Sequence, residues 1–366
     1  MNHDISPVVK RFQLVGECLD IRPYGAGHIH DTYAVRFRSP DGTIPRCILQ
    51  RLNTTVFQQP EQLMENIARV TAHLKAKIVA AGGDPMRETL NLVPARDGKT
   101  FVKTGTGEYW RAFHFIERSQ TYDTAVNWEH VAEVAKAYGL FLKRLSDFPL
   151  QQLHETIPDF HNITRRYEGL MLAVERDVKN RANGVKGKIA FVEDRLDDVS
   201  LFARLLEQGE LPRRVVHNDT KLGNVMIDDK TGEGICVIDL DTVMTGLSLY
   251  DFGDLVRSAA NPAAEDERDL SKVSFDLDIF ERCVRGYLEG TGDLLTPSEL
   301  DLFPFSAKLM TLECGARFLA DYLQGDVYFK INREGQNLDR SRVQFKLVED
   351  IEEKLGRISE IVERHR

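Results

Sequence analysis

The chain has 366 residues, of which 42% are hydrophobic and 29% are charged, so it is long enough for two domains and can bury a sizeable core. Its net charge of −9 argues against nucleic acid or an anionic membrane surface as the main partner. The longest apolar run, residues 170–174, spans five positions, whereas a membrane span needs about 20, so a transmembrane protein is excluded.

The N-terminus and the cysteines both favour a cytoplasmic protein. Residues 1–4 show no basic stretch followed by an apolar one, so we expect no signal peptide. The five cysteines are far apart in the sequence, with no C-x-x-C pair and no zinc spacing. We therefore expect reduced thiols and a cytoplasmic location.

Strand and turn patterns dominate roughly the first 115 residues. We expect a hairpin of residues 33–37 and 47–51, because both segments flank an Asp-Gly turn at residues 41–42. Between residues 63 and 81 the apolar residues recur at helical spacing, which predicts a helix that ends at the glycine pair 82–83. Further strands are predicted at residues 91–94, 100–104 and 110–116.

Helical patterns dominate from about residue 129 onward. A run of strand-like segments, residues 215–241, interrupts them. We therefore expect an α+β chain with a small β-rich N-terminal lobe, residues 1–116, and a larger, mostly helical C-terminal lobe, residues 117–366. The predicted helices of this second lobe cover residues 131–145, 189–202, 277–288, 306–323 and 340–362.

The strand-like run 215–241 carries the strongest functional signal. His217-x-Asp219 is followed by Asn224 and a short apolar strand, and after a glycine-containing turn a second apolar strand ends at Asp239. We expect these two strands to form a hairpin that places Asp239 beside Asn224. Phosphoryl transfer from a nucleotide needs a carboxylate that accepts the proton of the attacking hydroxyl, and an amide oxygen and a second carboxylate that hold Mg²⁺. The spacing of Asp219 and Asn224 is that of a kinase catalytic loop. A polar turn would explain each residue singly, but not the joint pattern.

A second acidic motif, Asp251-Phe-Gly253, spells the metal-binding signature of protein kinases. No apolar strand ends at Asp251, and residues 254–257 read as the start of a helix. Asp239, by contrast, lies at the end of a strand, where the metal ligand is expected. We therefore assign the metal to Asp239 and interpret Asp251 as a helix-capping or loop-fixing residue.

These motifs resemble the aminoglycoside phosphotransferase and choline kinase superfamily, the small-molecule relatives of protein kinases. The resemblance runs from Pro23 to about Phe345 and is greatest to the N-acetylhexosamine 1-kinase branch. It implies a bilobal protein-kinase-like fold, with nucleotide bound by the N-terminal lobe and catalysis in the C-terminal lobe, and it implies ATP and Mg²⁺. Its motifs are His217-Asn-Asp-Thr-Lys-Leu-Gly-Asn224, Ile238-Asp-Leu-Asp-Thr-Val-Met244 and Tyr250-Asp-Phe-Gly-Asp254.

The same resemblance implies roles for individual residues. Asp219 is implied as the catalytic base, in contact with the acceptor hydroxyl, and Asn224 and Asp239 as the Mg²⁺ ligands. In the hexosamine kinase branch, the stretch that precedes the first strand serves both phosphate and sugar. This implies His30 and Asp31 as sugar contacts.

Gly25 and Gly27 are candidate nucleotide-binding residues. Two glycines two positions apart would let backbone amides approach the phosphates, although an ordinary hairpin turn explains them equally well. The third strand lacks the lysine that kinases place there to grip the phosphates. Arg51 is the candidate replacement, with Glu61 or Glu65 on the next helix as its possible partner.

Two further groups of residues complete the candidate site. Phe115 and Ile116, in the connection between the lobes, are expected to line the adenine site, with core packing as an equal alternative. Near the C-terminus, Arg317, Asp321 and Tyr328 suit a polyhydroxylated ligand, with surface salt bridges as the alternative. The resemblance implies that Arg317 and Tyr328 contact the sugar.

The sequence thus predicts an ATP- and Mg²⁺-dependent kinase for a sugar hydroxyl, with the anomeric hydroxyl of an N-acetylhexosamine as the leading acceptor. Alternatives are a kinase for another small alcohol, such as an aminoglycoside, choline or an amino sugar, and a pseudokinase without chemistry. The partner is expected to be a small sugar or amino alcohol, with no nucleic acid and no membrane. A monomer or weak homodimer is expected.

Overall fold

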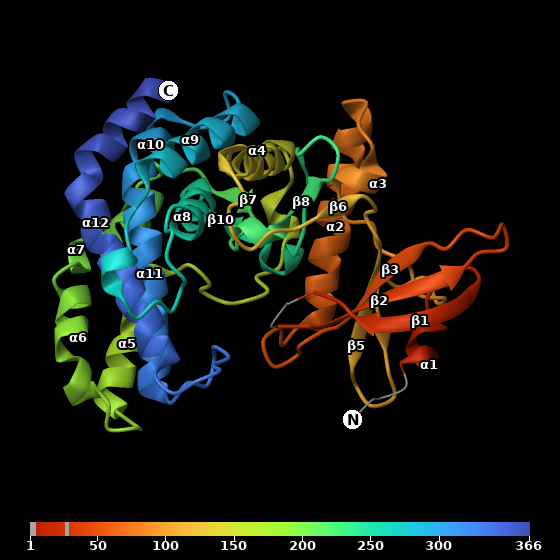
Figure 1. Cartoon of the computed structure of the whole chain (residues 1–366), viewed down its shortest axis with the longest axis horizontal. Helices are drawn as coiled ribbons and strands as arrows, with labels where there is room; N and C mark the ends of the chain where they lie inside the picture. The colour runs from red at the N-terminus through yellow and green to blue at the C-terminus, as the bar shows by residue number, and fades with distance from the viewer. Residues whose placement is uncertain (1–4, 26–28) are drawn as a thin grey trace.

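The computed structural model describes residues 5–25 and 29–366 and shows two lobes, a sheet-based N-terminal one and a helical C-terminal one (Figure 1). The N-terminal sheet is antiparallel, with the strand order β1-β2-β3-β5-β4. The predicted hairpin is confirmed as β2 and β3. The strands are β1 (Glu17–Pro23), β2 (Asp31–Arg38), β3 (Arg46–Arg51), β4 (Val102–Lys103) and β5 (Tyr109–His114).

The two faces of this sheet have different surroundings. Leu49 and Ala112 lie on the outer face, in a core that also contains residues from the short helix α1 (Ser6–Val9). Side chains alternate between the faces of a strand, so Gln50 and Arg111, which are paired in register, lie on the inner face that is turned toward the C-terminal lobe. Arg51 shares the outer face with Leu49.

Helix α2 (Pro60–Ala80) confirms the helix predicted here and stands between the sheet and the C-terminal lobe (Figure 1). Its apolar side chains, such as Leu63 and Ile67, belong to the same continuous core as the C-terminal helices. The strand predicted at residues 91–94 is wrong, because only Leu92 forms an isolated bridge there. Since α2 shares the large core, the division into residues 1–116 and 117–366 stays a prediction.

The C-terminal lobe is built on close helix contacts. Helices α4 (Trp128–Arg144) and α9 (Leu277–Thr291) approach each other at Gly286, where a Cβ would lie 2.2 Å from the carbonyl oxygen of Ala132. The stripe predicted as one helix over residues 189–202 is two helices, broken before Leu196. The other helices are α3 (Pro85–Glu88), α5 (Ile163–Arg176), α6 (Lys186–Glu193), α7 (Leu196–Glu207), α8 (Ser248–Ala259), α10 (Pro297–Asp301), α11 (Phe303–Gln324) and α12 (Gln336–His365).

The helical break has a local cause. Asp197 and Asp198 lie in the first turn of α7, where acidic side chains favour a new helix N-terminus. The guanidinium group of Arg195, at the break, donates to the carboxylate of Glu352 and to the carbonyl oxygen of Phe191. Within the described residues, no helix is long and apolar enough to cross a membrane.

Short strands at the centre of the C-terminal lobe position two loops. The predicted hairpin is confirmed as β8 and β9, and β6 extends it on the other side of β8. Strands β7 and β10 form a separate pair. The loop of residues 217–224 therefore joins the two small sheets, and so does the loop of residues 238–243. The strands are β6 (Ser119–Gln120), β7 (Arg214–Val216), β8 (Val225–Asp228), β9 (Gly234–Val237) and β10 (Met244–Gly246).

Candidate active site

The loop of residues 217–224 brings Asp219 and Asn224 together. The Asn224 side-chain amide donates to the Asp219 carboxylate over 3.0 Å, and the Lys221 ammonium group donates to the same oxygen over 2.8 Å. Burial is the largest single influence and raises the pKa of Asp219, but the charge and hydrogen bond of Lys221, together with His217 and the Asn224 hydrogen bond, outweigh it, so the pKa is lowered on balance. The Asp219 carboxylate is therefore charged at neutral pH and can accept a proton.

Asp251 fixes the conformation of this loop. Helix α8 begins at Ser248, earlier than predicted, so Asp251 lies in its first turn. Its carboxylate accepts the backbone N–H groups of His217 over 2.8 Å and Asn218 over 2.7 Å. Asn218 adopts a left-handed conformation with a φ of 67°, which asparagine tolerates, and the bond to Asp251 holds it there. The interpretation of Asp251 as a loop-fixing residue is confirmed.

We expect Asp251→Asn to destabilise the protein by about 2–4 kcal/mol and to lower kcat, because an amide offers one acceptor where two N–H groups need one each. Thermal unfolding followed by circular dichroism, together with steady-state kinetics, measures both effects. Asp276→Asn is the matched control, since Asp276 also accepts two backbone N–H groups but caps helix α9, where Asn serves equally well. Equal stability of both variants would contradict the role given to Asp251.

Asp239 follows β9 and adopts a left-handed conformation with a φ of 59°. The backbone N–H of Ile238 donates to the carbonyl oxygen of Asn224 over 2.9 Å, so the hairpin places Asp239 beside the catalytic loop, as the sequence predicts. Burial and the neighbouring carboxylates of Asp241 and Asp219 raise the pKa of Asp239 to about 7. A positive charge would relieve this repulsion.

These donors fit a divalent ion. The Asn224 amide uses its nitrogen for Asp219, and among the described residues its side-chain oxygen has no hydrogen-bond partner. An amide oxygen beside carboxylates is a set of hard oxygen ligands, as Mg²⁺ prefers. In the described part of the chain, no three or more His, Cys, Asp or Glu side chains form a metal site by themselves. A bound ion would therefore draw further ligands from phosphate.

A buried ion pair that sequence reasoning missed lies next to Asp239. Both terminal nitrogens of Arg111 donate to the Asp241 carboxylate, over 2.5 and 2.7 Å, and both side chains are 2% exposed. His30 joins the pair. Its Nδ1 accepts the backbone N–H of Asn53 over 3.0 Å, so its Nε2 carries the proton and donates to Asp241 over 3.2 Å. The signal in the sequence that could have indicated this pair is the charged residue Arg111 inside the otherwise mostly apolar strand β5.

The predicted glycine turn and sugar contacts occupy the same end of the sheet. Gly25 lies in an exposed turn with a φ of 75°, whereas Gly27 lies outside the described residues. Both ring nitrogens of His30 are already bonded inside the protein, so a sugar would have to displace one of them. Asp31 lies on the outer face of the sheet and accepts the guanidinium group of Arg51. The roles of these residues stay predictions.

Arg51 differs from the expectation in its partners. Its guanidinium group donates to Asp31 and, over 2.8 Å, to Glu108. The suggested pairing with Glu61 or Glu65 is wrong, because Arg51 lies on the outer face of the sheet and is bonded there to Asp31 and Glu108. Glu61 accepts the hydroxyl of Tyr109, and Glu65 accepts the side chains of Arg69 and His154. A phosphate contact by Arg51 stays a prediction.

The connection between the lobes contains the two candidate adenine contacts. Phe115 is half-buried, and the guanidinium carbon of Arg46 lies 3.6 Å from its ring centre. Ile116 is buried in a small cluster with Met226 and Cys236. The cluster joins the connection to the β8–β9 hairpin. An adenine contact by either residue stays a prediction, with packing as the observed role of Ile116.

Arg317 and Tyr328 lie in one neighbourhood at the end of α11. The Arg317 guanidinium carbon lies 5.6 Å from the ring centre of Phe329, and the Tyr328 ring packs against the same Phe329 ring. Asp321 does not belong to this surface. Its carboxylate accepts the backbone N–H groups of residues 327–329, which fixes the loop that presents Tyr328.

A second buried pair connects α11 to the catalytic loop. His161 donates through Nε2 to the carbonyl oxygen of Asn218 over 2.9 Å, and its Nδ1 lies 2.7 Å from the Glu313 carboxylate. Burial is the largest single influence and lowers the pKa of His161, but the charge and hydrogen bond of Glu313, with the bond to Asn218, together outweigh it and raise the pKa on balance. Sequence reasoning missed His161, since an isolated histidine outside a motif carries no signal.

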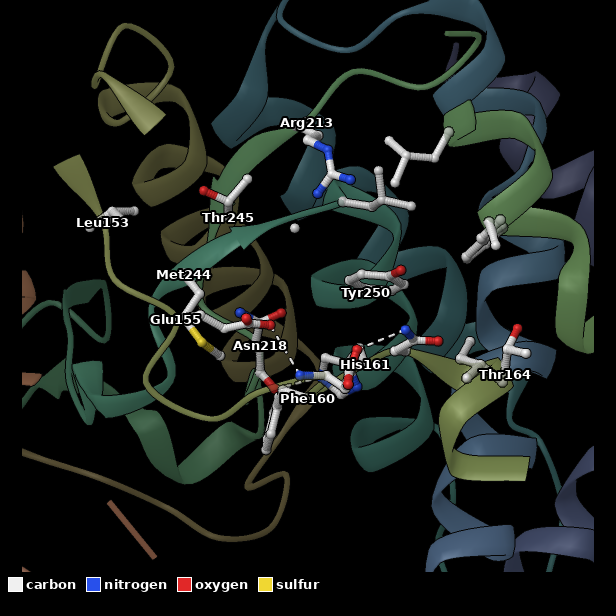
Figure 2. A pocket seen from close by; sticks show the side chains of 18 of the residues that line it. Leu153, Glu155, Phe160, His161, Thr164, Arg213, Asn218, Met244, Thr245 and Tyr250 are labelled. Atoms are coloured by element: carbon white, nitrogen blue, oxygen red, sulfur yellow. Dashed lines mark hydrogen bonds between the residues drawn. The ribbon is translucent and has the colours of Figure 1, made fainter. Parts of the chain in front are cut away.

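A pocket of about 420 Å³ borders the catalytic loop at Asn218 (Figure 2). It lies between the segment of residues 153–164, helix α7 and the start of α8, and Arg213 extends toward Tyr250 inside it. Asp219, Asn224 and Asp239 do not line it. The pocket is therefore next to the candidate site and separate from its metal ligands. Its other polar lining residues include Glu155, Asp159 and Thr245.

Comparison with known proteins identifies both a family and a fold. The model of a family described as the phosphotransferase enzyme family matches residues 20–283. An aminoglycoside phosphotransferase from Alicyclobacillus acidocaldarius is 12% identical with a TM-score of 0.62, over 98% of this chain and 96% of that one. A choline kinase from Cryptosporidium parvum is 14% identical with a TM-score of 0.55, over 92% and 90%.

A microcompartment-associated aminopropanol kinase is likewise 14% identical, with a TM-score of 0.54 over 97% of this chain and 99% of that one. Similarity at this level of identity concerns the fold alone. The predicted bilobal, kinase-like α+β fold is confirmed.

Proposed function

The chain belongs to the phosphotransferase enzyme family, and on this basis we propose that it is an ATP- and Mg²⁺-dependent kinase that phosphorylates a sugar hydroxyl. The leading acceptor is the anomeric hydroxyl of an N-acetylhexosamine. The observation that carries the kinase proposal is the grouping of Asp219, Asn224 and Asp239 on two loops joined by the β8–β9 hairpin. This grouping supplies one base and two metal ligands.

The reaction would be an in-line transfer. Asp219 would orient the acceptor hydroxyl and take its proton while the acceptor oxygen forms a bond to the γ-phosphorus and the bond to the departing ADP oxygen breaks. Asn224 and Asp239 would hold the metal, which neutralises charge on the phosphates when bound. Lys221 would keep Asp219 ionised and oriented through its 2.8 Å bond.

Charges near α11 favour a neutral acceptor over a cationic one. Arg166 and Arg317 lie 3.7 and 3.8 Å from one oxygen of Glu313, whose other oxygen is bonded to His161. Two guanidinium groups therefore surround a single carboxylate that is already paired. Such a surface suits the hydroxyl and carbonyl oxygens of a sugar, and the nearby ring of Phe329 can cover a sugar face.

A cationic amino alcohol or aminoglycoside is the second candidate acceptor. The pocket of Figure 2 favours it, because Glu155 and Asp159 bring two carboxylates to its lining against the single guanidinium group of Arg213. Carboxylates of this kind would attract an ammonium group. The two acceptor classes therefore differ in the part of the C-terminal lobe that would bind them.

Consumption of ATP with Mg²⁺ tests the proposal against N-acetylglucosamine, N-acetylgalactosamine, glucose, galactose, choline and kanamycin. We expect turnover on the N-acetylhexosamines, with an anomeric phosphate in the ³¹P NMR spectrum. Turnover on choline or kanamycin alone would contradict the sugar acceptor and support a cationic acceptor instead. ATP binding without turnover on any acceptor would favour the pseudokinase alternative.

A further inference from the structure

The inner face of β3 lacks a cation at the position next to the candidate metal ligands. Ile48 and Gln50 share this face, while Arg51 shares the outer face with Leu49. Gln50 is thus the inner-face residue of β3 that contacts Arg111, the partner of Asp241. Its side chain is neutral, so the nucleotide phosphates would need positive charge from another element.

Arg111 lies directly opposite Gln50 in the strand register and fills this need. Its Nε donates to the side-chain oxygen of Gln50 over 2.8 Å, and its two terminal nitrogens donate to Asp241. A guanidinium group has five N–H donors, and these bonds use three of them, which leaves two. The side chain is 2% exposed, so a phosphate has to enter between the sheet and the C-terminal lobe to reach them. Three other arginines of β2 and β3 on this face, Arg36, Arg38 and Arg46, pair instead with Asp20, Glu17 and Glu117, none of which is a candidate metal ligand.

The pair with Asp241 places this cation next to the metal region. Asp241 follows Asp239 by two residues, and Arg111 comes from the opposite lobe, 130 positions earlier in the sequence. A buried ion pair contributes little net stability, because desolvation of the two charges offsets their attraction. The ion pair instead determines position, because it holds a guanidinium group of the N-terminal sheet beside the loop that carries Asp239.

We infer that Arg111 supplies the positive charge that binds the nucleotide phosphates, in place of a lysine on β3, and that Asp241 holds it in position. This inference rests on the proposed kinase function. Arg111 would donate its remaining N–H groups to phosphate oxygens, a charge-assisted contact. Arg51, on the outer face and paired with Asp31 and Glu108, would not take part.

Binding of ATP, ADP and adenosine, measured by isothermal titration calorimetry with and without Mg²⁺, tests the inference without turnover. We expect Arg111→Met to weaken ATP and ADP about 10- to 100-fold and to leave adenosine within about twofold, because adenosine has no phosphate. Arg111→Lys should recover part of the loss. Arg36→Met, which removes an exposed arginine from the same sheet, is the matched control and should bind all three ligands as the wild type does.

Because Arg111→Met leaves Asp241 buried without a partner, the double variant Arg111→Met/Asp241→Asn is measured as well. It removes both charges, and we expect the same selective loss of ATP and ADP. An equal loss for adenosine in the double variant would reduce Arg111 to a structural role and overturn the inference. A selective loss in Arg51→Met with none in Arg111→Met would also overturn it. Failure of the wild-type protein to bind any nucleotide would overturn the proposed function itself.

Discussion

Asp219→Asn is expected to lower kcat by at least about 10³-fold while nucleotide affinity stays within about threefold. An amide cannot accept the proton of the acceptor hydroxyl, but it has the same shape as the carboxylate. Its oxygen can still accept the Asn224 side chain, which donates to Asp219 over 3.0 Å in the wild type. The loop should therefore keep its conformation, and the loss should fall on the chemical step.

Single-turnover kinetics and calorimetric ATP binding separate these two effects. Asp229→Asn is a suitable control, because Asp229 lies in the turn of the β8–β9 hairpin and bonds only the side chain of Gln120 among the described partners of its carboxylate. That variant should turn over at the wild-type rate. If Asp219→Asn retained the wild-type rate as well, Asp219 would not be the base.

Asp239→Asn is expected to abolish most activity, about 10²-fold or more, and at the same time to stabilise the protein without metal. The wild-type carboxylate is half-buried, and desolvation together with the charges of Asp241 and Asp219 raises its pKa to about 7. Ionised Asp239 therefore costs stability when no cation is bound. Asn also tolerates the left-handed conformation of this position, where φ is 59°, so the substitution changes charge without backbone strain.

The pH dependence of unfolding follows from this raised pKa. Between about pH 4, where the unfolded carboxyl titrates, and the folded pKa of about 7, the folded protein holds a proton that the unfolded chain has lost. The contribution of Asp239 to unfolding free energy therefore falls as pH rises through this window. We expect Asp239→Asn to raise Tm by a few degrees at pH 8 and to match the wild type near pH 4.

Scanning calorimetry in the absence of divalent ions measures this difference, and Mg²⁺ with ATP provides the second arm. The wild type should gain Tm when both ligands are added, whereas Asp239→Asn should gain much less. A variant that is less stable than the wild type at pH 8 without ligand would contradict the assignment of unfavourable charge to Asp239.

Local sequence patterns were sufficient for the elements that form within a short stretch of chain. The β8–β9 hairpin and the loop before it depend on turn residues and apolar strands that are adjacent in sequence, so the proximity of Asp219, Asn224 and Asp239 was predictable. Helix α2 was predictable for the same reason, since its apolar spacing alone sets its buried face. The roles of the sugar and nucleotide contacts stay predictions.

Element boundaries were less predictable than the elements themselves. The apolar spacing of residues 189–202 is compatible with one helix, but the acidic pair Asp197 and Asp198 begins a new one. The Asp-Gly turn at residues 97–98 suggested a strand at residues 91–94, but this segment forms only an isolated bridge at Leu92. In both places apolar spacing alone cannot decide whether a helix or strand continues or breaks. Helix caps and tertiary contacts contribute energies as large as the local preference itself.

The sequence by itself determined the two-lobed α+β class, the family motifs and the catalytic loop, because each depends on residues close together in the chain. Only the tertiary structure decided which of two arginines lies on the inner face of the sheet, toward the C-terminal lobe. Arg51 and Arg111 are both arginines on neighbouring strands, and the pleat of the sheet turns one outward and the other toward Asp241. The Arg111–Asp241 pair joins residues 130 positions apart, and no local preference encodes such a contact. The pair forms because folding buries both side chains between the lobes, and a buried charge without an opposite charge beside it is strongly unfavourable.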